Sequence, residues 1–125
     1  MPGLAQFKKI LIIEDDIALA NSLSAFLSCD YEIILAATGE AGLVKAVENQ
    51  PDLILLDITL PGKNGIEILK ELKSNPQTDD IEVLVLTNIG EPEIVGKIFN
   101  AGGRQYLIKS DWSLDAIAKK IKEVI

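Results

Sequence analysis

The chain has 125 residues, 48% hydrophobic and 25% charged, so we expect one globular domain with a buried core rather than a disordered segment. Its net charge of −7 argues against direct binding to a nucleic-acid backbone. The apolar runs are far too short to cross a membrane, and no signal peptide is present, so we expect a cytoplasmic protein without membrane association. The single cysteine, Cys29, cannot form an internal disulfide and is expected to be half-buried on a helix.

Short apolar runs of strand length alternate five times with longer stretches whose apolar residues have helical spacing. The runs show little polar alternation, which is typical of strands buried on both faces in a parallel sheet covered by helices. The predicted strands span residues 10–13, 31–36, 53–56, 83–86 and 106–108. This order predicts an α/β fold of five βα units with a doubly wound, mostly parallel sheet.

Local signals mark where the helices between these strands begin. Asn64, followed three residues later by Glu67, resembles a capping box at the start of the third helix. Pro92 suits the first turn of the fourth helix, and Ser113 is a suitable N-cap for the last helix.

Four of the five predicted strands end in polar residues, and ligands of open α/β sheets bind outside the carboxyl ends of the strands. Clustered carboxylates repel one another unless a cation joins them, and Mg²⁺ prefers a few carboxylates together with water and a phosphate oxygen. We therefore expect a cation site at this edge. The strand-ending polar residues are Glu14, Asp15 and Asp16 after the first strand, Asp57 after the third, Thr87 after the fourth and Lys109 after the fifth.

Each of these residues taken alone also has an ordinary structural interpretation. An acidic run is more often a solvated turn, Asp57 resembles a helix N-cap, Thr87 is a β-branched strand residue, and Lys109 resembles a surface lysine. Only their joint placement at the carboxyl ends of strands favours a site.

Four segments, in this order and spacing, resemble the receiver domain of bacterial and archaeal response regulators. They read KKILIIEDD, LILLDITLPGKNG, VLVLT and QYLIK. The resemblance covers nearly the whole chain, so residues 1–125 are interpreted as a single receiver domain with its core from about residue 8. It implies a flavodoxin-like fold with strand order 2-1-3-4-5.

The resemblance implies that Asp57 is the phosphoacceptor of a two-component or phosphorelay system. Glu14 and Asp15 match the acidic pair that organises Mg²⁺ (or Mn²⁺), and Asp16 resembles a third, less essential acidic residue. An oxygen of Asp57 and the backbone carbonyl of Thr59 would complete the metal site.

Three further residues have implied roles around the phosphoryl group. Thr87 matches the hydroxyl residue that hydrogen-bonds the phosphoryl group, and Lys109 matches the lysine that neutralises one of the phosphoryl oxygens. Tyr106 matches the aromatic switch position. In the family, this ring rotates inward after phosphorylation and reshapes the helix 4–strand 5–helix 5 face. Magnesium, ammonium and hydroxyl would together stabilise charge on the transferring group.

The implied partners are a sensor histidine kinase or a histidine phosphotransfer protein, and an unknown downstream protein. The chain contains no histidine, so the donor must be another molecule. The protein would catalyse only its own phosphorylation and dephosphorylation, and is otherwise not an enzyme. A homodimer through the helix 4–helix 5 face is a further possibility.

Three residues depart from the family pattern. Ser110 follows Lys109 where the family usually has a proline in a cis peptide; without proline, a cis bond costs about 2.5–4 kcal/mol. Asn88 follows Thr87 where a small residue is common. Ile89 is apolar at a position that controls the access of water, so we predict slow autodephosphorylation.

Three alternatives compete with a phosphorylated switch. A receiver-like interaction module that no longer accepts phosphate is supported only by Ser110 and Asn88. A phosphatase of the haloacid dehalogenase type needs a second Asp two residues after the nucleophile, where this chain has Thr59. Flavin or dinucleotide binding is disfavoured by the acidic first βα turn, which lacks a GxGxxG fingerprint.

Overall fold

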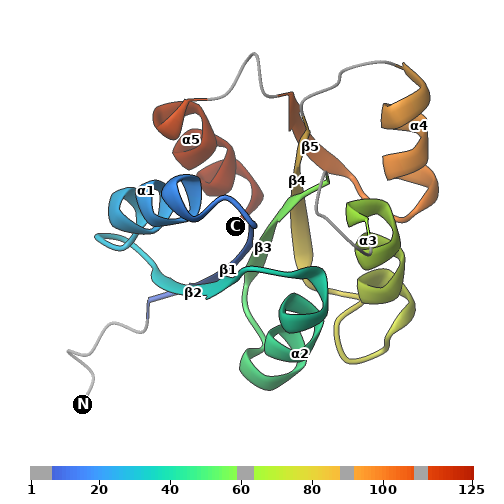
Figure 1. Cartoon of the computed structure of the whole chain (residues 1–125), viewed down its shortest axis with the longest axis horizontal. Helices are drawn as coiled ribbons and strands as arrows, with labels where there is room; N and C mark the ends of the chain where they lie inside the picture. Colours follow the sequence, from blue (N-terminus) through green and yellow to red (C-terminus); the bar gives the residue numbers. More distant parts are fainter. Residues whose placement is uncertain (1–6, 59–63, 88–91, 109–112) are drawn as a thin grey trace.

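Five strands and five helices alternate along the chain in the computed structural model, which describes residues 7–58, 64–87, 92–108 and 113–125 (Figure 1). The elements are β1 (Lys9–Ile13), α1 (Ile17–Leu27), β2 (Glu32–Ala36), α2 (Gly39–Asn49), β3 (Leu53–Asp57), α3 (Gly65–Ser74), β4 (Glu82–Thr87), α4 (Pro92–Asn100), β5 (Gln105–Ile108) and α5 (Leu114–Val124).

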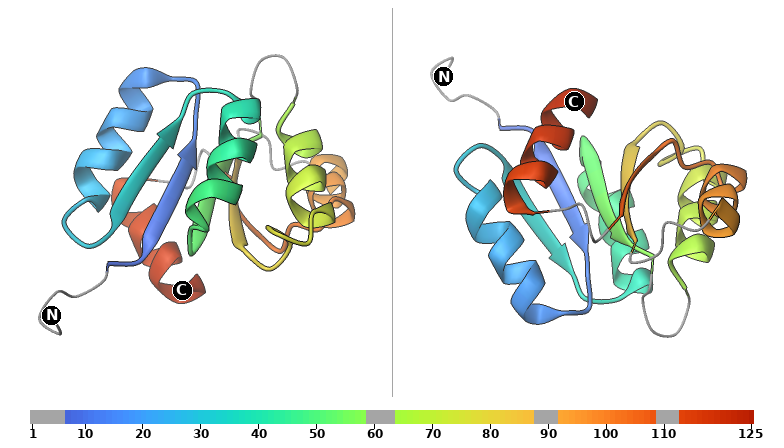
Figure 2. Two further views of the ribbon diagram at one scale, coloured as in Figure 1. Left: turned by 90° about the horizontal axis from the view of Figure 1, so that it is seen from below. Right: turned by 90° about the horizontal axis from the view of Figure 1, so that it is seen from above.

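The strands form one parallel sheet in the order β2-β1-β3-β4-β5, which confirms the predicted fold class and strand order (Figure 2). The three central strands are almost entirely buried, whereas most residues of the edge strands β2 and β5 are only half-buried. This difference explains why the runs of β1, β3 and β4 are so apolar, because both faces of a central parallel strand are covered by helices.

Alternate residues of the central strands enter two separate cores, one on each face of the sheet. Helices α1 and α5 cover one face, while α2, α3 and α4 cover the other (Figure 1). Ile10 and Ile12 of β1 belong to the first core, and Leu11 and Ile13 belong to the second. The three-layer arrangement covers both faces of the sheet and leaves the carboxyl ends of the strands open to ligands.

Side-chain caps define the start of four helices. Asn64 caps α3 by accepting a 3.0 Å hydrogen bond from the backbone N–H of Glu67, and Ser113 caps α5 by accepting one of 3.1 Å from Ala116, both as predicted. In a full capping box, the Glu67 side chain would accept a hydrogen bond from the backbone N–H of Asn64. Here it accepts one from the side-chain amide of Asn64 instead, at 3.3 Å. Thr38 caps α2, which the sequence analysis did not single out.

Two further findings concern the general character of the chain. Cys29 is exposed in the turn that follows α1, so the expected half-buried position on a helix is wrong. Among the described residues, none of the helices combines the length and the apolar character needed to span a bilayer.

Candidate functional site

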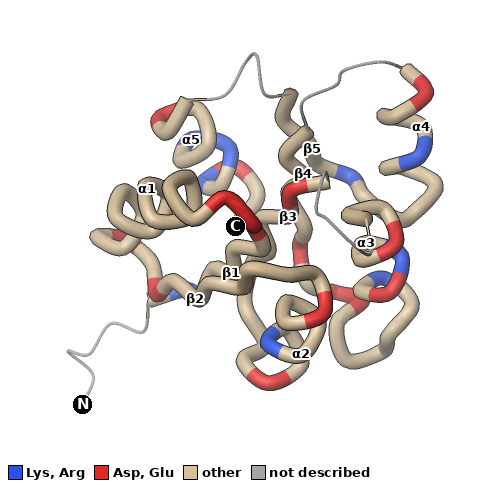
Figure 3. The backbone as a smooth tube through the Cα atoms, viewed as in Figure 1, with Lys and Arg blue, Asp and Glu red and all other residues tan. Residues whose placement is uncertain are grey.

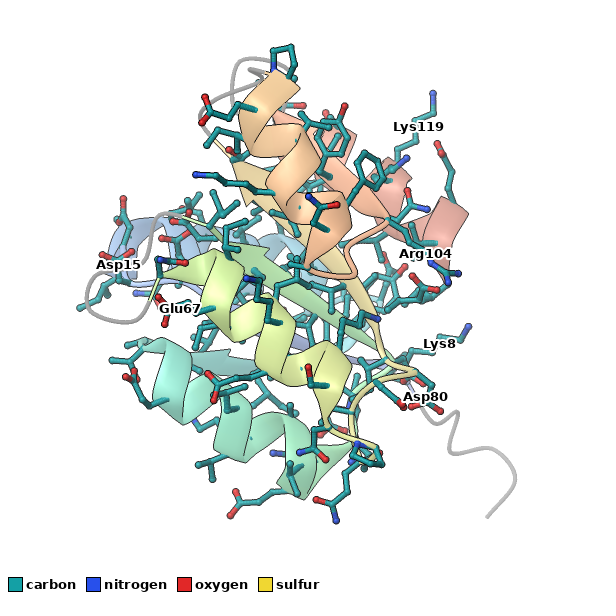
Figure 4. All side chains as sticks on the ribbon, turned by 90° about the vertical axis from the view of Figure 1, so that its right-hand side faces the viewer. Lys8, Asp15, Glu67, Asp80, Arg104 and Lys119 are labelled. Atoms are coloured by element: carbon teal, nitrogen blue, oxygen red, sulfur yellow. The ribbon has the colours of Figure 1, made fainter. Side chains whose placement is uncertain are left out.

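The carboxyl ends of β1 and β3 bring three carboxylates together. Because Ile13 pairs with Leu56 in the sheet, the next residues, Glu14 and Asp57, lie side by side. One carboxylate oxygen from each of Glu14, Asp15 and Asp57 lies within 4.8 Å of the other two. Figure 3 shows the acidic stretch where β1 turns into α1, and Figure 4 places Asp15 at the end of the molecule opposite Lys8 and Asp80.

Glu14 is the most deeply buried member of this cluster, with only 4% of its surface exposed. Its Oε2 accepts a 3.1 Å hydrogen bond from the backbone N–H of Asp16, whereas its Oε1 is buried without a hydrogen-bond partner. Burial, together with the nearby carboxyls of Asp57 and Asp15, raises the pKa of Glu14 to about 8, and the hydrogen bond from Asp16 opposes part of this rise.

This arrangement fits a hard divalent cation. A buried carboxylate oxygen without a partner is costly, and a positive ion beside it would remove the cost while screening the repulsion among the three carboxylates. The donors are all oxygens, which Mg²⁺ and Mn²⁺ prefer, and their number is small enough to leave positions for water and a phosphate oxygen.

Asp16 has a structural role that the sequence analysis did not identify. Its side chain caps α1, where Oδ1 accepts a 3.1 Å hydrogen bond from the backbone N–H of Leu19, and its own N–H binds Glu14. Among the described residues it is not part of the three-carboxylate cluster. Asp16 therefore stabilises the first turn of α1 and fixes the orientation of the Glu14 side chain.

Asp57 is the last residue of β3, and the backbone around it is held on two sides. The N–H of Ile58 donates to the carbonyl of Leu86 on β4 at 3.1 Å, and the N–H of Gly65 donates to the carbonyl of Ile58 at 3.1 Å. A Cβ on Gly65 would collide with the Cα of Ile58 and would lie 2.8 Å from the carbonyl oxygen of Asp57. Sequence reasoning missed Gly65; the only signal was a poor helix former immediately after an N-cap.

Thr87 is the last residue of β4, the strand beside β3, and only 1% of its surface is exposed. Tyr106 lies on β5, in register with Val85, and its half-buried ring packs against the core on the α2–α4 side. The ring of Phe99 from α4 meets it edge-on, with centroids 6.2 Å apart and planes at 90°. Phe99 is 51% exposed and was not singled out from the sequence.

Several predicted residues lie outside the described part of the chain. These are Thr59 and Lys109 of the predicted site, and Asn88, Ile89 and Ser110, which depart from the family pattern. Their roles stay predictions from the sequence.

The fold and the acidic cluster can be compared with known proteins. The family model described as "Response regulator receiver domain" matches residues 10–122. The chain belongs to this family. Receiver domains are signalling modules of two-component systems and not enzymes in the ordinary sense.

Curated relatives of this receiver domain are regulators. It is 41% identical over 101 residues to the transcriptional regulatory protein CiaR of Streptococcus pneumoniae, an alignment that covers 81% of this chain and 44% of the relative. It is 38% identical over 102 residues to the DNA-binding dual master transcriptional regulator RpaA of a Synechocystis strain, covering 81% of this chain and 42% of the relative. The receiver domain thus spans less than half the length of these relatives.

Solved structures resemble the receiver domain over nearly its full length. The chemotaxis protein CheY4 of Vibrio cholerae has a TM-score of 0.89 at 27% identity, covering 95% of this chain and 99% of that one. A CheY-like response regulator receiver domain protein from Methanospirillum hungatei has a TM-score of 0.84 at 33% identity, covering 94% and 92%.

Proposed function

We propose that this receiver domain accepts a phosphoryl group on Asp57 in a Mg²⁺-dependent reaction and thereby works as a switch in two-component signalling. The observation that carries the proposal is the cluster of Glu14, Asp15 and Asp57 at the carboxyl ends of adjacent strands, with an oxygen of Glu14 buried and unpartnered. Thr87 ends the next strand of the same sheet, on the other side of Asp57.

The chemistry is the formation of an acyl phosphate. A carboxylate oxygen of Asp57 attacks phosphorus, the new O–P bond forms, and the P–N bond to a donor imidazole breaks as that imidazole takes up a proton. The Thr87 hydroxyl would donate a hydrogen bond to one phosphoryl oxygen. By the family resemblance, the Lys109 ammonium would neutralise another. Attack by water on the acyl phosphate would later restore the carboxylate and release inorganic phosphate.

The metal would be held by this chain's own carboxylates. Asp15 and Asp57 are the direct ligands we assign, with the backbone carbonyl of Thr59 as a further one, while Glu14 lies beneath them in the protein. The bound ion supplies positive charge between an anionic nucleophile and an anionic donor. Glu14, whose pKa is raised to about 8 in the metal-free chain, would lose its proton when the cation binds, and its carboxylate would then add negative charge beside the ligands.

The donor we propose is a phosphohistidine on a sensor kinase or phosphotransfer protein, outside these 125 residues, which contain no histidine. Ile17, the first residue of α1, is 71% exposed beside the acidic turn and offers an apolar contact for such a donor protein. Tyr106 would transmit the change to the α4–β5–α5 face, which would contact a downstream protein or a second copy.

The test is incubation with MgCl₂ and acetyl phosphate, followed by intact-mass measurement. We expect a gain of one phosphoryl group that is absent in Asp57→Asn and absent when EDTA replaces the metal. A matched control is Asp52→Asn at the other end of β3, where the carboxylate accepts a 2.7 Å hydrogen bond from the N–H of Lys9. That variant should still be phosphorylated.

Two other outcomes would contradict the proposal. A folded protein with no adduct would support an interaction module that works without phosphorylation. Steady consumption of acetyl phosphate without a lasting adduct would indicate a phosphatase.

A further inference from the structure

A groove of about 470 Å³ lies between α3 and α4, which are neighbouring helices on one face of the sheet (Figure 4). Its most deeply buried lining residues are Ile58, which directly follows Asp57, and Thr87 at the end of β4. Ile66 of α3 and Ile94 of α4, both half-buried, also line it. The groove is therefore largely apolar inside and opens between two helices.

The two helices beside the groove are held at a fixed spacing by close packing around Gly103, which follows α4. A Cβ at Gly103 would lie 2.7 Å from Cγ2 of Ile98 on α4 and 3.0 Å from Cδ2 of Leu69 on α3. Ile98 and Leu69 are both fully buried, and Ile66 and Ile94 pack against the same core. The groove is therefore preformed, and a ligand would not have to order its walls.

The charges at this groove differ in sign from the net charge of the whole chain, which is −7. Of the described residues that line the groove, Lys70 of α3 and Lys97 of α4 are positive and only Glu67 is negative. The carboxylate of Glu67 already accepts a 3.3 Å hydrogen bond from the side-chain amide of Asn64. Neither lysine side chain forms an ion pair or a hydrogen bond with a described residue, although Glu93 lies four residues before Lys97 on the same helix. The groove therefore presents one available ammonium group from each of its two helices.

We propose that this groove binds a small organic anion, whose apolar body packs against the isoleucines and whose carboxylate or phosphate group contacts Lys70 and Lys97. The apolar lining accounts for the first property of the ligand, and the two ammonium groups account for the second. The volume of the groove lies within the range of about 300–1,000 Å³ that is typical of small-molecule sites, so one compact ligand would occupy it. A positively charged ligand of the same shape would be repelled by both lysines.

The groove is separate from the proposed phosphoacceptor site, although the two are neighbours. Ile58 follows Asp57 along the chain, but the groove lies on the side of α3 and α4 and is lined by none of the three clustered carboxylates. Those carboxylates repel an anion, whereas the two lysines of the groove attract one. Binding at the groove should therefore need neither Asp57 nor Mg²⁺.

The test is a titration of the ¹⁵N-labelled whole chain with 4-phenylbutyrate in the absence of Mg²⁺, followed by ¹H–¹⁵N correlation spectra. We expect saturable shifts of backbone signals in α3 and α4, with a dissociation constant of about 1 mM or tighter. The amine 4-phenylbutylamine, which has the same apolar body and a positive charge, should not bind. Acetate, which lacks the apolar body, should bind at least about tenfold more weakly. The proposal would be overturned by a lack of saturable binding, by equal affinity for the amine, or by shifts centred outside α3 and α4.

Substitutions of the two lysines locate the anion within the groove. Lys70→Gln and Lys97→Gln should each weaken the binding of 4-phenylbutyrate about threefold or more, and the double variant about tenfold. The control is Lys119→Gln, which makes the same charge change at an exposed side chain of α5, on the opposite face of the sheet (Figure 4), and should change the affinity by less than about twofold. Equal losses in the control and in the groove variants would overturn the proposal, because binding would then follow net charge alone. Asp57→Asn should bind 4-phenylbutyrate as the parent does, so a failure of phosphorylation cannot be mistaken for a failure of this site.

Discussion

The first residue of α3, Gly65, lies so close to the end of β3 that a Cβ there would be 2.8 Å from the carbonyl oxygen of Asp57. The neighbours are backbone atoms of the strand that carries the proposed phosphoacceptor, and backbone cannot give way as a flexible side chain can. We therefore expect Gly65→Ala to destabilise the fold by about 1–3 kcal/mol in urea unfolding and to slow phosphorylation by acetyl phosphate.

Gly96, in the middle of α4, provides the control for Gly65, since a Cβ there would meet nothing within 4 Å. Gly96→Ala should stabilise the protein by about 0.5–1 kcal/mol, because alanine is the better helix former. If both substitutions changed the free energy of unfolding in the same direction, the close approach of the backbone at Gly65 could not be the reason for its effect.

The stability of the metal-free domain should fall as the pH rises from about 4.5 to about 8, because the pKa of Glu14 is raised to about 8 in the folded chain. Between these values the folded chain keeps a proton that the unfolded chain loses, so the free energy of unfolding decreases with pH. Urea unfolding should show a fall on the order of a few kcal/mol that is absent in Glu14→Gln.

Mg²⁺ should restore most of the free energy of unfolding that the metal-free domain loses as the pH rises. It should stabilise the protein more at pH 8 than at pH 5, because protons and metal compete for the same carboxylates. Two results would contradict the assignment of the cation site. One is a stabilisation by Mg²⁺ of equal size at both pH values, and the other is a stabilisation that the double variant Asp15→Asn/Asp57→Asn retains in full.

Asp16 should matter as a helix cap and not as a carboxylate. Asp16→Ala removes the acceptor for the N–H of Leu19 and should cost about 1 kcal/mol of stability. Asp16→Asn keeps an acceptor oxygen and should leave stability and Mg²⁺ affinity nearly unchanged. A large loss of metal affinity in Asp16→Asn would instead indicate a direct electrostatic role.

Tyr106 should change its environment after phosphorylation, because its ring is half-buried against the core and contacts the exposed ring of Phe99. In protein labelled with fluorotyrosine, the ¹⁹F signal of Tyr106 should shift when acetyl phosphate and Mg²⁺ are added. The signal of Tyr31, at the opposite end of the sheet beside β2, should stay constant. A shift that persists in Asp57→Asn would exclude phosphorylation as its cause.

Ile89 should slow the loss of the phosphoryl group, because an apolar side chain at this position hinders access of water; this prediction rests on the sequence, since the residue lies outside the described part of the chain. We expect both Ile89→Glu and Ile89→Ala to shorten the lifetime of the phosphorylated protein. An unchanged or longer lifetime would show the prediction to be wrong.

The sequence by itself determined the features that depend on neighbouring residues. The apolar runs specified five βα units, and Asn64 and Ser113 were identified as caps because a cap acts within three residues of its own position. Asp57 and Thr87 were placed at strand ends, which in a parallel sheet share one edge, so the sequence also predicted their neighbourhood.

Only the tertiary structure decided which atoms meet across elements. It showed that Glu14 is buried with an unpartnered oxygen, that Asp16 serves α1, and that Gly65 is needed behind Asp57. These properties arise from contacts between residues far apart in sequence, and the periodicity of a single helix or strand carries no record of them.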